Sequence, residues 1–374
     1  MHVAFLNENT LGHASYLMPF VRWFEAHPEA GIQPHVIHAT PLPSGMKWRA
    51  DFSIRGLRKA GLDFHNARWR LTVSEHVRNE LEALRAKQPL DAVIVNTQSV
   101  ALELSDIAKE VPVCVCLDAT FQQLAGSHWF APNAPTRWLL PLTLAPLTSP
   151  ERVLFHAAAK LFPWSDSVAD SLRRDYQEPA EKIQPLPPSL ELTHLPFKPR
   201  TTPGSKPRLL FIGGDYARKG GPLLLEVFRQ HFAQRAELHI VTQSPVNAEP
   251  GVTVHHHVQA YSPEWLALWE QADAFVFPST LETFGLVLVE ALALGVPVIT
   301  GNVGAAVELM GADERGLLLK DNHAATLKQA LEALLNDYPA AVKRAAAGRA
   351  WVEQRHNLAR NAGVLAETLR GLRR

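Results

Sequence analysis

The 374-residue sequence predicts an α/β protein with two doubly wound domains, each built on a parallel sheet. Short apolar runs alternate with amphipathic helical segments in both halves, as is typical of parallel strands covered by helices on both faces. Between the halves, residues 185–207 hold seven prolines and few periodic apolar positions. We therefore expect a first domain at 1–190, a linker at 191–207 and a second domain at 208–350.

The individual elements follow from the same patterns. Strands are expected in the first half at Val3–Leu6, His35–His38, Ala92–Val95, Val113–Leu117 and Leu161–Trp164. Helices are expected there at His13–Ala26, Val73–Ala86, Val100–Lys109 and Arg152–Lys160. The second half predicts strands at Leu209–Ile212, Leu238–Val241, Val252–His255, Ala274–Phe277, Val296–Thr300 and Gly316–Leu319. A last helix is expected within 351–374, from Trp351 to about Leu372.

Composition excludes several classes of protein. The formal net charge is zero, so no overall field favours nucleic acid, and no nucleic-acid partner is expected. Cys114 and Cys116 point to the same side of one apolar strand, which favours a core position over metal or redox chemistry. The polar amino terminus does not resemble a signal peptide, and no apolar run reaches about 18 residues. A cytoplasmic protein is expected.

The segment from Phe277 to Thr300 predicts a ligand site. Glu290 stands in a helix that is apolar on every side, where an unpaired carboxylate costs several kcal/mol. Folding alone favours an apolar residue there, so we expect Glu290 to face a cleft and hold a polar ligand. Gly285 precedes the helix, whose free N–H groups suit phosphate. The alternative is an ordinary strand-to-helix connection with Glu282 on the surface.

The pattern P-S-x-x-E-x-F-G-x-x-x-x-E-A-x-A-x-G-x-P-V, from Pro278 to Val298, resembles the signature of glycosyltransferase family 4. These are retaining enzymes of the GT-B architecture. The resemblance implies two Rossmann-like domains facing each other across a cleft, the first on the acceptor side. It also implies that the last helix crosses back to the first domain. By the same resemblance Glu282 lies against the donor sugar and Glu290 holds the nucleotide ribose. The donor-binding stretch between them comprises Thr283, Phe284, Gly285 and Leu286.

A second motif opens the second domain, where a strand ends at Gly213-Gly214 and Arg218-Lys219-Gly220-Gly221 leads into a helix. Lysine beside a glycine-rich helix start is a good pyrophosphate ligand, and the resemblance assigns Lys219 to the donor diphosphate. Relatives often carry an arginine where Gly214 stands, so Arg218 either substitutes for it or is a surface residue. The resemblance also brings Thr242 towards the donor and packs the backbone of His257 and Val258 against the base.

In the first domain, the loop containing Gly12 and His13 joins the first strand to the first helix. Open α/β sheets place ligands at this end of a strand, and the resemblance puts this loop under the donor phosphates. His13 either contacts a phosphate or caps the helix. Asp118 ends another strand, where many relatives carry a histidine near the donor sugar. Asp118 either bonds sugar hydroxyls or caps a helix.

These observations predict a metal-independent retaining glycosyltransferase that moves a sugar from a nucleotide diphosphate donor to a sugar or lipid-linked acceptor. Glu282, Lys219 and Asp118 are the expected catalytic residues. No D-x-D occurs, and neither a metal nor a cofactor is expected. Two alternatives stay open. One is a nucleotide-sugar epimerase of the same fold, and the other is a non-catalytic nucleotide-sugar binder.

The segment Ser44–Arg78 carries eight basic and three acidic residues, a local charge of +5, interleaved with aromatics. Its basic residues are Lys47, Arg49, Arg55, Arg58, Lys59, Arg68, Arg70 and Arg78, and its acidic ones are Asp51, Asp63 and Glu75. Three interpretations stay open: peripheral contact with an anionic membrane, a grip on a phosphorylated acceptor, or a solvated helix with core aromatics.

Overall fold

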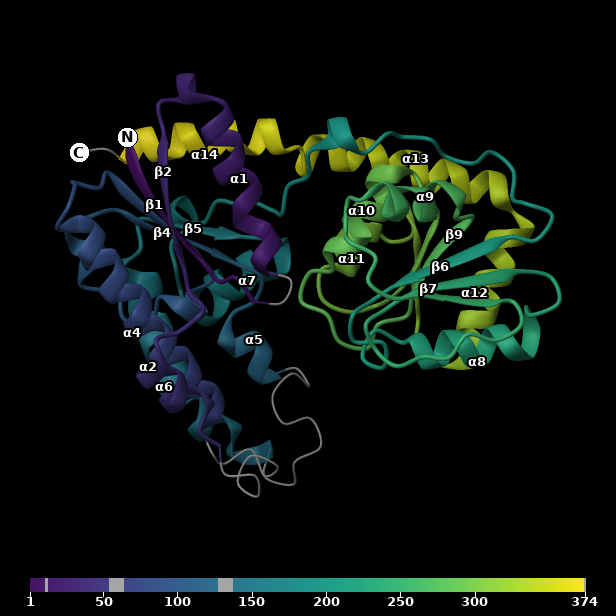
Figure 1. Ribbon diagram of the computed structural model, residues 1–374, viewed down its shortest axis with the longest axis horizontal. Coiled ribbons are helices and arrows are strands. Elements are labelled where there is room, and N and C mark those ends of the chain that lie inside the picture. Colours follow the sequence, from purple (N-terminus) through teal and green to yellow (C-terminus); the bar gives the residue numbers. More distant parts are fainter. Residues whose placement is uncertain (11–12, 54–63, 127–136, 373–374) are drawn as a thin grey trace. The chain divides into compact units, whose positions relative to one another are not determined.

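The protein divides into two compact units. The computed structural model describes residues 1–10, 13–53, 64–126 and 137–372. Unit 1 comprises residues 1–189 and 358–374, and unit 2 comprises residues 190–357, so the proline-rich segment 191–207 lies in unit 2. Each unit holds a parallel sheet among helices (Figure 1). The predicted class of two doubly wound α/β domains is confirmed.

Unit 1 has a sheet of order β2-β1-β3-β4-β5, in which all paired strands are parallel. The strands are β1 (His2–Asn7), β2 (Gln33–His38), β3 (Ala92–Asn96), β4 (Val113–Leu117) and β5 (Lys160–Pro163). The helices are α1 (Ala14–Ala26), α2 (Ser44–Asp51), α4 (His65–Arg85), α5 (Phe121–Gly126), α6 (Leu140–Ala157), α7 (Asp166–Asp175) and α14 (Leu358–Leu372). The strand order reverses between β1 and β3, because β2 pairs on one side of β1 and the later strands follow on the other.

Unit 2 has a sheet of order β11-β10-β9-β6-β7-β8, again with parallel pairs. The strands are β6 (Arg208–Ile212), β7 (Glu237–Val241), β8 (Val252–His255), β9 (Ala274–Phe277), β10 (Val298–Gly301) and β11 (Leu317–Leu319). The helices are α8 (Gly221–His231), α9 (Pro263–Gln271), α10 (Leu286–Leu294), α11 (Ala306–Met310), α12 (Ala324–Asn336) and α13 (Tyr338–Arg355). Helices cover both faces, with α8 beside α12 (Figure 1). Here the order reverses between β6 and β9.

Both sheets are central and their strands are nearly continuous in apolar residues, because helices bury both faces. The five residues of β4 are all buried, including Cys114 and Cys116. Burial raises the pKa of both thiols, that of Cys116 to about 12. The core interpretation of the two cysteines is confirmed, because thiols held in this protonated form are poor nucleophiles and metal ligands.

The prediction of a helix at Val100–Lys109 is wrong. Two 3₁₀ turns, η3 (Gln98–Val100) and η4 (Ile107–Lys109), stand there with turns between them. Thr97 caps the first turn by accepting a hydrogen bond from the Ser99 N–H. The Leu102 N–H donates to the Ser74 hydroxyl at 2.6 Å instead of to a helical carbonyl. Side-chain oxygens therefore capture the backbone groups that a helix needs.

Two further helix predictions need correction. The helix expected to begin at Arg152 begins at Leu140, with Pro146 and Pro150 inside it and its sides packed on α4 and α5. The last helix is not continuous across 351–374, because α13 ends at Arg355 and α14 starts at Leu358. The His356 carbonyl accepts the Leu190 N–H at 2.8 Å, so it does not continue the helix. In Figure 1, α14 lies beside α1 within unit 1.

Three glycines let the loop after β9 lie directly on its neighbours. A Cβ atom at Gly220 would stand 2.1 Å from the Pro278 carbonyl oxygen, and one at Gly301 would stand 2.1 Å from that of Ser279. At Gly304 it would stand 2.2 Å from the Glu282 carbonyl oxygen. The position of Glu282 therefore depends on backbones that carry no side chain.

We predict that Gly301→Ala destabilises unit 2 by about 1–3 kcal/mol, because the added methyl group overpacks this contact. Gly301 does not have a left-handed φ, so the effect isolates crowding from backbone strain. Gly214→Ala is the matched control, since its added methyl group meets nothing within 4 Å. Thermal and denaturant unfolding compare the two variants, and equal stabilities would contradict the close approach.

Candidate functional site

The candidate site of unit 2 lies where the strand order reverses. β6 and β9 are neighbours that run in parallel, and each leads into a loop followed by a helix. The loop of residues 213–220 joins β6 to α8, and the loop of residues 278–285 joins β9 to α10. Ligands of open α/β sheets bind outside the carboxyl ends of the strands at such a reversal.

The two loops are joined by Arg218. Its backbone carbonyl accepts the Thr280 N–H at 3.3 Å, and its Nη1 donates to the Leu281 carbonyl at 2.8 Å. Its Nε donates to the Asp215 carboxylate in its own loop at 3.1 Å. The guanidinium thus holds the loops together, and a donor-binding role for Arg218 stays a prediction.

Lys219 and Glu282 meet across these loops in an ion pair. The two side chains are only 16% and 9% exposed, and the ammonium also lies 5.2 Å from the centre of the Phe277 ring. Burial lowers the pKa of Lys219 although the Glu282 carboxylate opposes the shift. The sequence predicted both residues as ligand-binding, and the structure brings them together.

Two helix N-termini adjoin the pair. Gly220 precedes α8 and Gly285 precedes α10, both in the left-handed region with φ of 83° and 85°. Because both N-cap residues are glycines, neither helix has a side-chain cap. In α8 the Gly221 N–H already donates to the Tyr216 carbonyl at 2.9 Å and Pro222 has no N–H, so this helix contributes mainly the positive end of its dipole. The N-terminus of α10 suits an anion through both its dipole and its first N–H groups.

Glu290 lies in the second turn of α10 and is half-buried. Its Oε1 accepts a hydrogen bond from the Tyr261 hydroxyl at 2.8 Å. Burial raises the pKa of Glu290 to about 7, against the effect of the tyrosine. Tyr261 gave no signal in the sequence, because a tyrosine in a loop has no pattern that assigns it a partner.

The other residues predicted in unit 2 lie near the carboxyl ends of β7, β8 and β9. Thr242 is 3% exposed, and its Oγ1 accepts the Ser244 N–H at 3.1 Å. His257 is exposed with a φ of 65°, and Val258 follows it after β8. The loop after β9 contributes the rest of the set: Thr283, the buried Phe284, Gly285 and Leu286 at the start of α10. Because β9, β6, β7 and β8 are adjacent, these loops form one row.

In unit 1, the His13 ring lies between two carboxylates at the carboxyl ends of β1 and β4. Its Nδ1 is 3.2 Å from Glu8 Oε1, and its Nε2 is 3.0 Å from Asp118 Oδ2. Burial lowers the pKa of His13, but Asp118 and Glu8 outweigh it and raise the pKa well above its usual range. His13 is therefore a cation here, and the Asp118 carboxylate pairs with it. Gly12 lies outside the described residues.

Glu8 was missed by sequence reasoning, although a carboxylate directly after an apolar strand is a usable signal. It is 5% exposed and accepts a hydrogen bond from Thr97 Oγ1 at 2.7 Å. Burial opposes its ionisation, but His13, Thr97 and Arg70 outweigh burial and lower the pKa of Glu8. The cluster therefore combines Glu8 and Asp118 with two cations, His13 and Arg70.

Glu151 of α6 is a second missed residue and is fully buried. Its Oε1 accepts the Phe121 N–H at 2.9 Å and Gln98 Nε2 at 3.0 Å, and the Tyr176 hydroxyl donates to its Oε2. Burial raises the pKa of Glu151 to about 8 despite these donors. It anchors the start of α5, just beyond Asp118. No sequence pattern separates it from an exposed helix glutamate.

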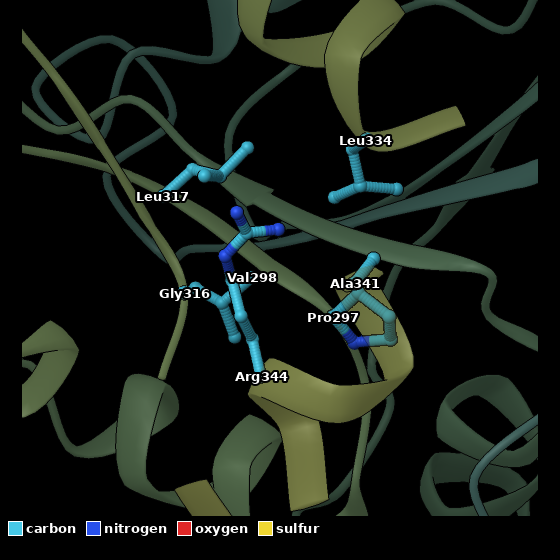
Figure 2. A pocket seen from close by; sticks show the side chains of 7 residues that line it. All are labelled: Pro297, Val298, Gly316, Leu317, Leu334, Ala341 and Arg344. Carbon is cyan, nitrogen blue, oxygen red and sulfur yellow. The ribbon is translucent and has the colours of Figure 1, made fainter. Parts of the chain in front are cut away.

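Unit 2 also has a small cavity that is distinct from the site around Lys219, Glu282 and Glu290. It has a volume of about 10 Å³, room for about one water, and Arg344 reaches into it (Figure 2). Its lining comprises Pro297, Val298, Gly316, Leu317, Leu334, Ala341 and Arg344. A cavity of this size holds no nucleotide.

The described residues contain no group of three or more histidine, cysteine, aspartate or glutamate side chains placed to hold a metal. Metal independence stays a prediction. Within the same described ranges, every helix is too short or too polar to traverse a bilayer.

Residues 196–351 match the family model of glycosyl transferases group 1. This range contains Lys219, Glu282 and Glu290. D-inositol 3-phosphate glycosyltransferase from Arthrobacter sp. (strain FB24) is 31% identical over 203 residues, which are 48% of this chain and 48% of that protein. The chain thus spans about half the length of the curated inositol-phosphate relatives that it matches.

Solved structures match nearly the whole chain. Sucrose-phosphate synthase from Thermosynechococcus elongatus has a TM-score of 0.72 and 19% identity, covering 100% of this chain and 99% of that one. HepE from Anabaena, solved with UDP and glucose, has a TM-score of 0.64 and 16% identity, covering 98% of each chain. At these identities the likeness shows the fold, which is the two-domain α/β fold of GT-B glycosyltransferases.

We predict that Glu290 makes stability fall as pH rises from about 4.5 to 7. The folded protein holds the Glu290 proton up to about pH 7, whereas the unfolded chain loses it near 4.5. The stabilisation is therefore complete below pH 4.5 and is lost as pH rises through the folded pKa of Glu290, by at most about 3.5 kcal/mol at about 1.4 kcal/mol per pKa unit.

The measurement is the difference in unfolding free energy between wild type and Glu290→Gln at several pH values from 5 to 8. The difference should change across this window. In Tyr261→Phe the window should move to higher pH, because the hydrogen bond that favours the carboxylate is lost. A difference independent of pH would contradict the raised pKa of Glu290.

Proposed function

We propose that the protein is a retaining glycosyltransferase of family 4, which moves a sugar from a nucleotide diphosphate to an acceptor hydroxyl. The carrying observation is the buried Lys219–Glu282 ion pair at the strand-order reversal of unit 2, beside two helix N-termini. Glu290 lies on one of these helices. The family-model match covers this whole arrangement and supports the proposal.

In this proposal unit 2 stabilises the departing diphosphate. Lys219, the N-terminal N–H groups of α10 and the positive end of the α8 dipole meet the negative charge that grows as the sugar–phosphate bond breaks. Glu282 orients the sugar through its hydroxyls, and Glu290 accepts hydrogen bonds from the ribose. The backbone at His257 and Val258 packs against the base, while Thr242 and residues 283–286 line the donor.

Unit 1 contributes Asp118 and His13 in this proposal. Asp118 bonds a hydroxyl of the transferred sugar, and the imidazolium of His13 keeps the Asp118 carboxylate paired in the absence of substrate. Both ring nitrogens of His13 face carboxylates, so its contact with a donor phosphate stays a prediction. Glu8 and Arg70 complete this cluster.

Relatives indicate which donors to test first. The HepE structure contains UDP and glucose. A mycobacterial relative, 37% identical over 107 residues, is named as a GDP-mannose-dependent mannosyltransferase. We propose a nucleoside diphosphate hexose as donor and a sugar or lipid-linked acceptor. The epimerase alternative has no support among these relatives, and a non-catalytic nucleotide-sugar binder is separated from a transferase by turnover.

We also propose contact between unit 1 and lipid, through aromatic rather than basic side chains. Arg49 is bound to Glu75, Arg78 is bound to Asp106, and Arg70 is half-buried, so these cations are not free to meet lipid phosphates. Arg55, Arg58, Lys59 and Asp63 lie outside the described residues.

The lipid-contact face is the side of α2 formed by Ser44, Lys47, Trp48, Asp51 and Phe52. Trp48 is 71% exposed and Phe52 is 46% exposed, and their rings lie 5.7 Å apart. Exposed aromatic pairs on a short helix suit the headgroup region of a bilayer. This face lines an open hollow of about 410 Å³.

We predict that the protein hydrolyses or transfers from one nucleotide sugar in a panel of UDP-glucose, GDP-mannose and ADP-glucose. Lys219→Met should lower kcat by about 10²–10³, because Lys219 offsets charge that appears mainly in the transition state. Lys320→Met, which removes an exposed lysine of the same unit, is the matched control and should keep wild-type kcat. Wild-type kcat in Lys219→Met would exclude the assignment.

Two further arms of this assay test the finer claims. Excess EDTA should leave the rate unchanged, and a rate abolished by EDTA and restored by Mg²⁺ would refute metal independence. NMR of the product should show the anomeric configuration of the donor. An inverted product would refute retention. Interconversion of the nucleotide sugars without transfer would favour an epimerase, and binding without turnover a non-catalytic protein.

We predict that wild type co-sediments with liposomes and that Trp48→Ser with Phe52→Ser abolishes this. Val307→Ser, at a 48% exposed apolar residue of unit 2, is the matched control and should bind like wild type. High salt should weaken binding only slightly, because aromatic insertion is not screened. Binding that is lost at high salt but is unaffected by the double substitution would show that basic side chains, rather than Trp48 and Phe52, mediate the lipid contact.

A further inference from the structure

The Lys219–Glu282 ion pair joins two side chains that the proposed function assigns to different parts of one ligand. Lys219 comes from the loop after β6 and Glu282 from the loop after β9. Among the described residues, Lys219 is the one hydrogen-bond partner of the Glu282 carboxylate. In the unliganded protein, the side chain proposed to bind phosphate, Lys219, and the side chain proposed to bind the sugar, Glu282, therefore form a hydrogen bond with each other.

Because both side chains are largely buried, each charge needs a partner. Glu282 is 9% exposed and Lys219 is 16% exposed, so little water reaches either group. Removing one partner from a buried ion pair leaves an uncompensated charge, which is far more costly than losing an exposed pair. A diphosphate that takes the Lys219 ammonium thus leaves Glu282 in need of a new donor.

An intact nucleotide sugar supplies that donor and a bare nucleotide diphosphate does not. The phosphates accept from Lys219, and a sugar hydroxyl next to them donates to Glu282. With the bare diphosphate, the Glu282 carboxylate stays buried without a hydrogen bond, or it keeps Lys219 away from the phosphates. Either outcome weakens binding of the bare diphosphate.

We propose that the Lys219–Glu282 pair is an exchange contact by which the site discriminates an intact nucleotide sugar from the nucleotide diphosphate product. This inference rests on the proposed function. The ion pair opens when the donor binds and reforms once the sugar has left, which favours release of the product. Glu282 is then a specificity-determining residue as well as a sugar ligand.

The inference predicts a gain of affinity on mutation, which misfolding cannot produce. In Glu282→Gln the side chain keeps its size and one acceptor oxygen, exchanges the other oxygen for an NH₂ donor, and no longer binds the ammonium as a charge. Lys219 is then available to phosphate without exchange. Affinity for the bare diphosphate should rise by about tenfold, while that for the nucleotide sugar should change by less than about threefold, since a tenfold change corresponds to about 1.4 kcal/mol.

Calorimetry tests this with two matched ligand pairs, UDP with UDP-glucose and GDP with GDP-mannose, on wild type and Glu282→Gln. Asp215→Asn is the control, because it removes one negative charge from the same region, a carboxylate that pairs with Arg218, while Lys219 contacts the backbone carbonyl of Asp215. It should raise diphosphate affinity far less than Glu282→Gln. Glu282→Ala serves as a second variant, and melting temperatures confirm folding.

The outcomes separate this inference from the proposed function. Wild type should bind the nucleotide sugar at least about tenfold more tightly than its diphosphate, and Glu282→Gln should nearly abolish that preference. Nucleotide-sugar binding by wild type, with no gain of diphosphate affinity in either Glu282 variant, would overturn the exchange contact alone. A wild type that binds none of the four ligands would overturn both the inference and the proposed function.

Discussion

Charge that is removed from water has to be paired, and this constraint determines the arrangement at the carboxyl edge of both sheets. In unit 2, Lys219 is paired with Glu282. In unit 1, the His13 ring lies between Glu8 and Asp118. The clusters arise separately: the unit 2 pair forms where the strand order reverses between β6 and β9, and the unit 1 cluster joins residues that follow β1 and β4, with β3 between these strands. A parallel sheet with a reversal brings such groups close, and burial then makes their pairing compulsory.

The close approach of the two loops limits the access of water to the Lys219–Glu282 ion pair of unit 2. The loop of residues 278–285 rests on the backbones of Gly220, Gly301 and Gly304, and Arg218 joins it to the loop after β6. Any side chain at the three glycines would lift the loop and admit water around Glu282. Water would screen the ion pair and weaken the need for each charge to keep a partner. Backbone packing therefore sets the electrostatics of the site.

The sequence predicted the strands well, because helices bury both faces of each sheet and the strands are correspondingly apolar. It also selected Lys219 and Glu282, which the structure brings together, and Glu290, and the ligand contacts of all three stay predictions. Sequence reasoning did not find the hydrogen-bond or ion-pair partners of the predicted site residues. Tyr261, which binds Glu290, and the Glu8 carboxylate, which faces His13, are such cases. The helix expected at 100–109 failed for the same reason, since the Ser74 hydroxyl captures a backbone N–H of that segment.

The two ends of the unit 2 site differ in how their carboxylates are held. At one end, Glu282 is paired with Lys219 in a buried ion pair. At the other end, burial brings the pKa of Glu290 to about 7, so this carboxylate changes charge near neutrality. A ligand hydroxyl that donates to Glu290 favours its ionised form and releases a proton on binding. If the proposed function holds, proton release should therefore accompany ribose binding at Glu290, whereas phosphate binding at Lys219 would exchange one anion for another.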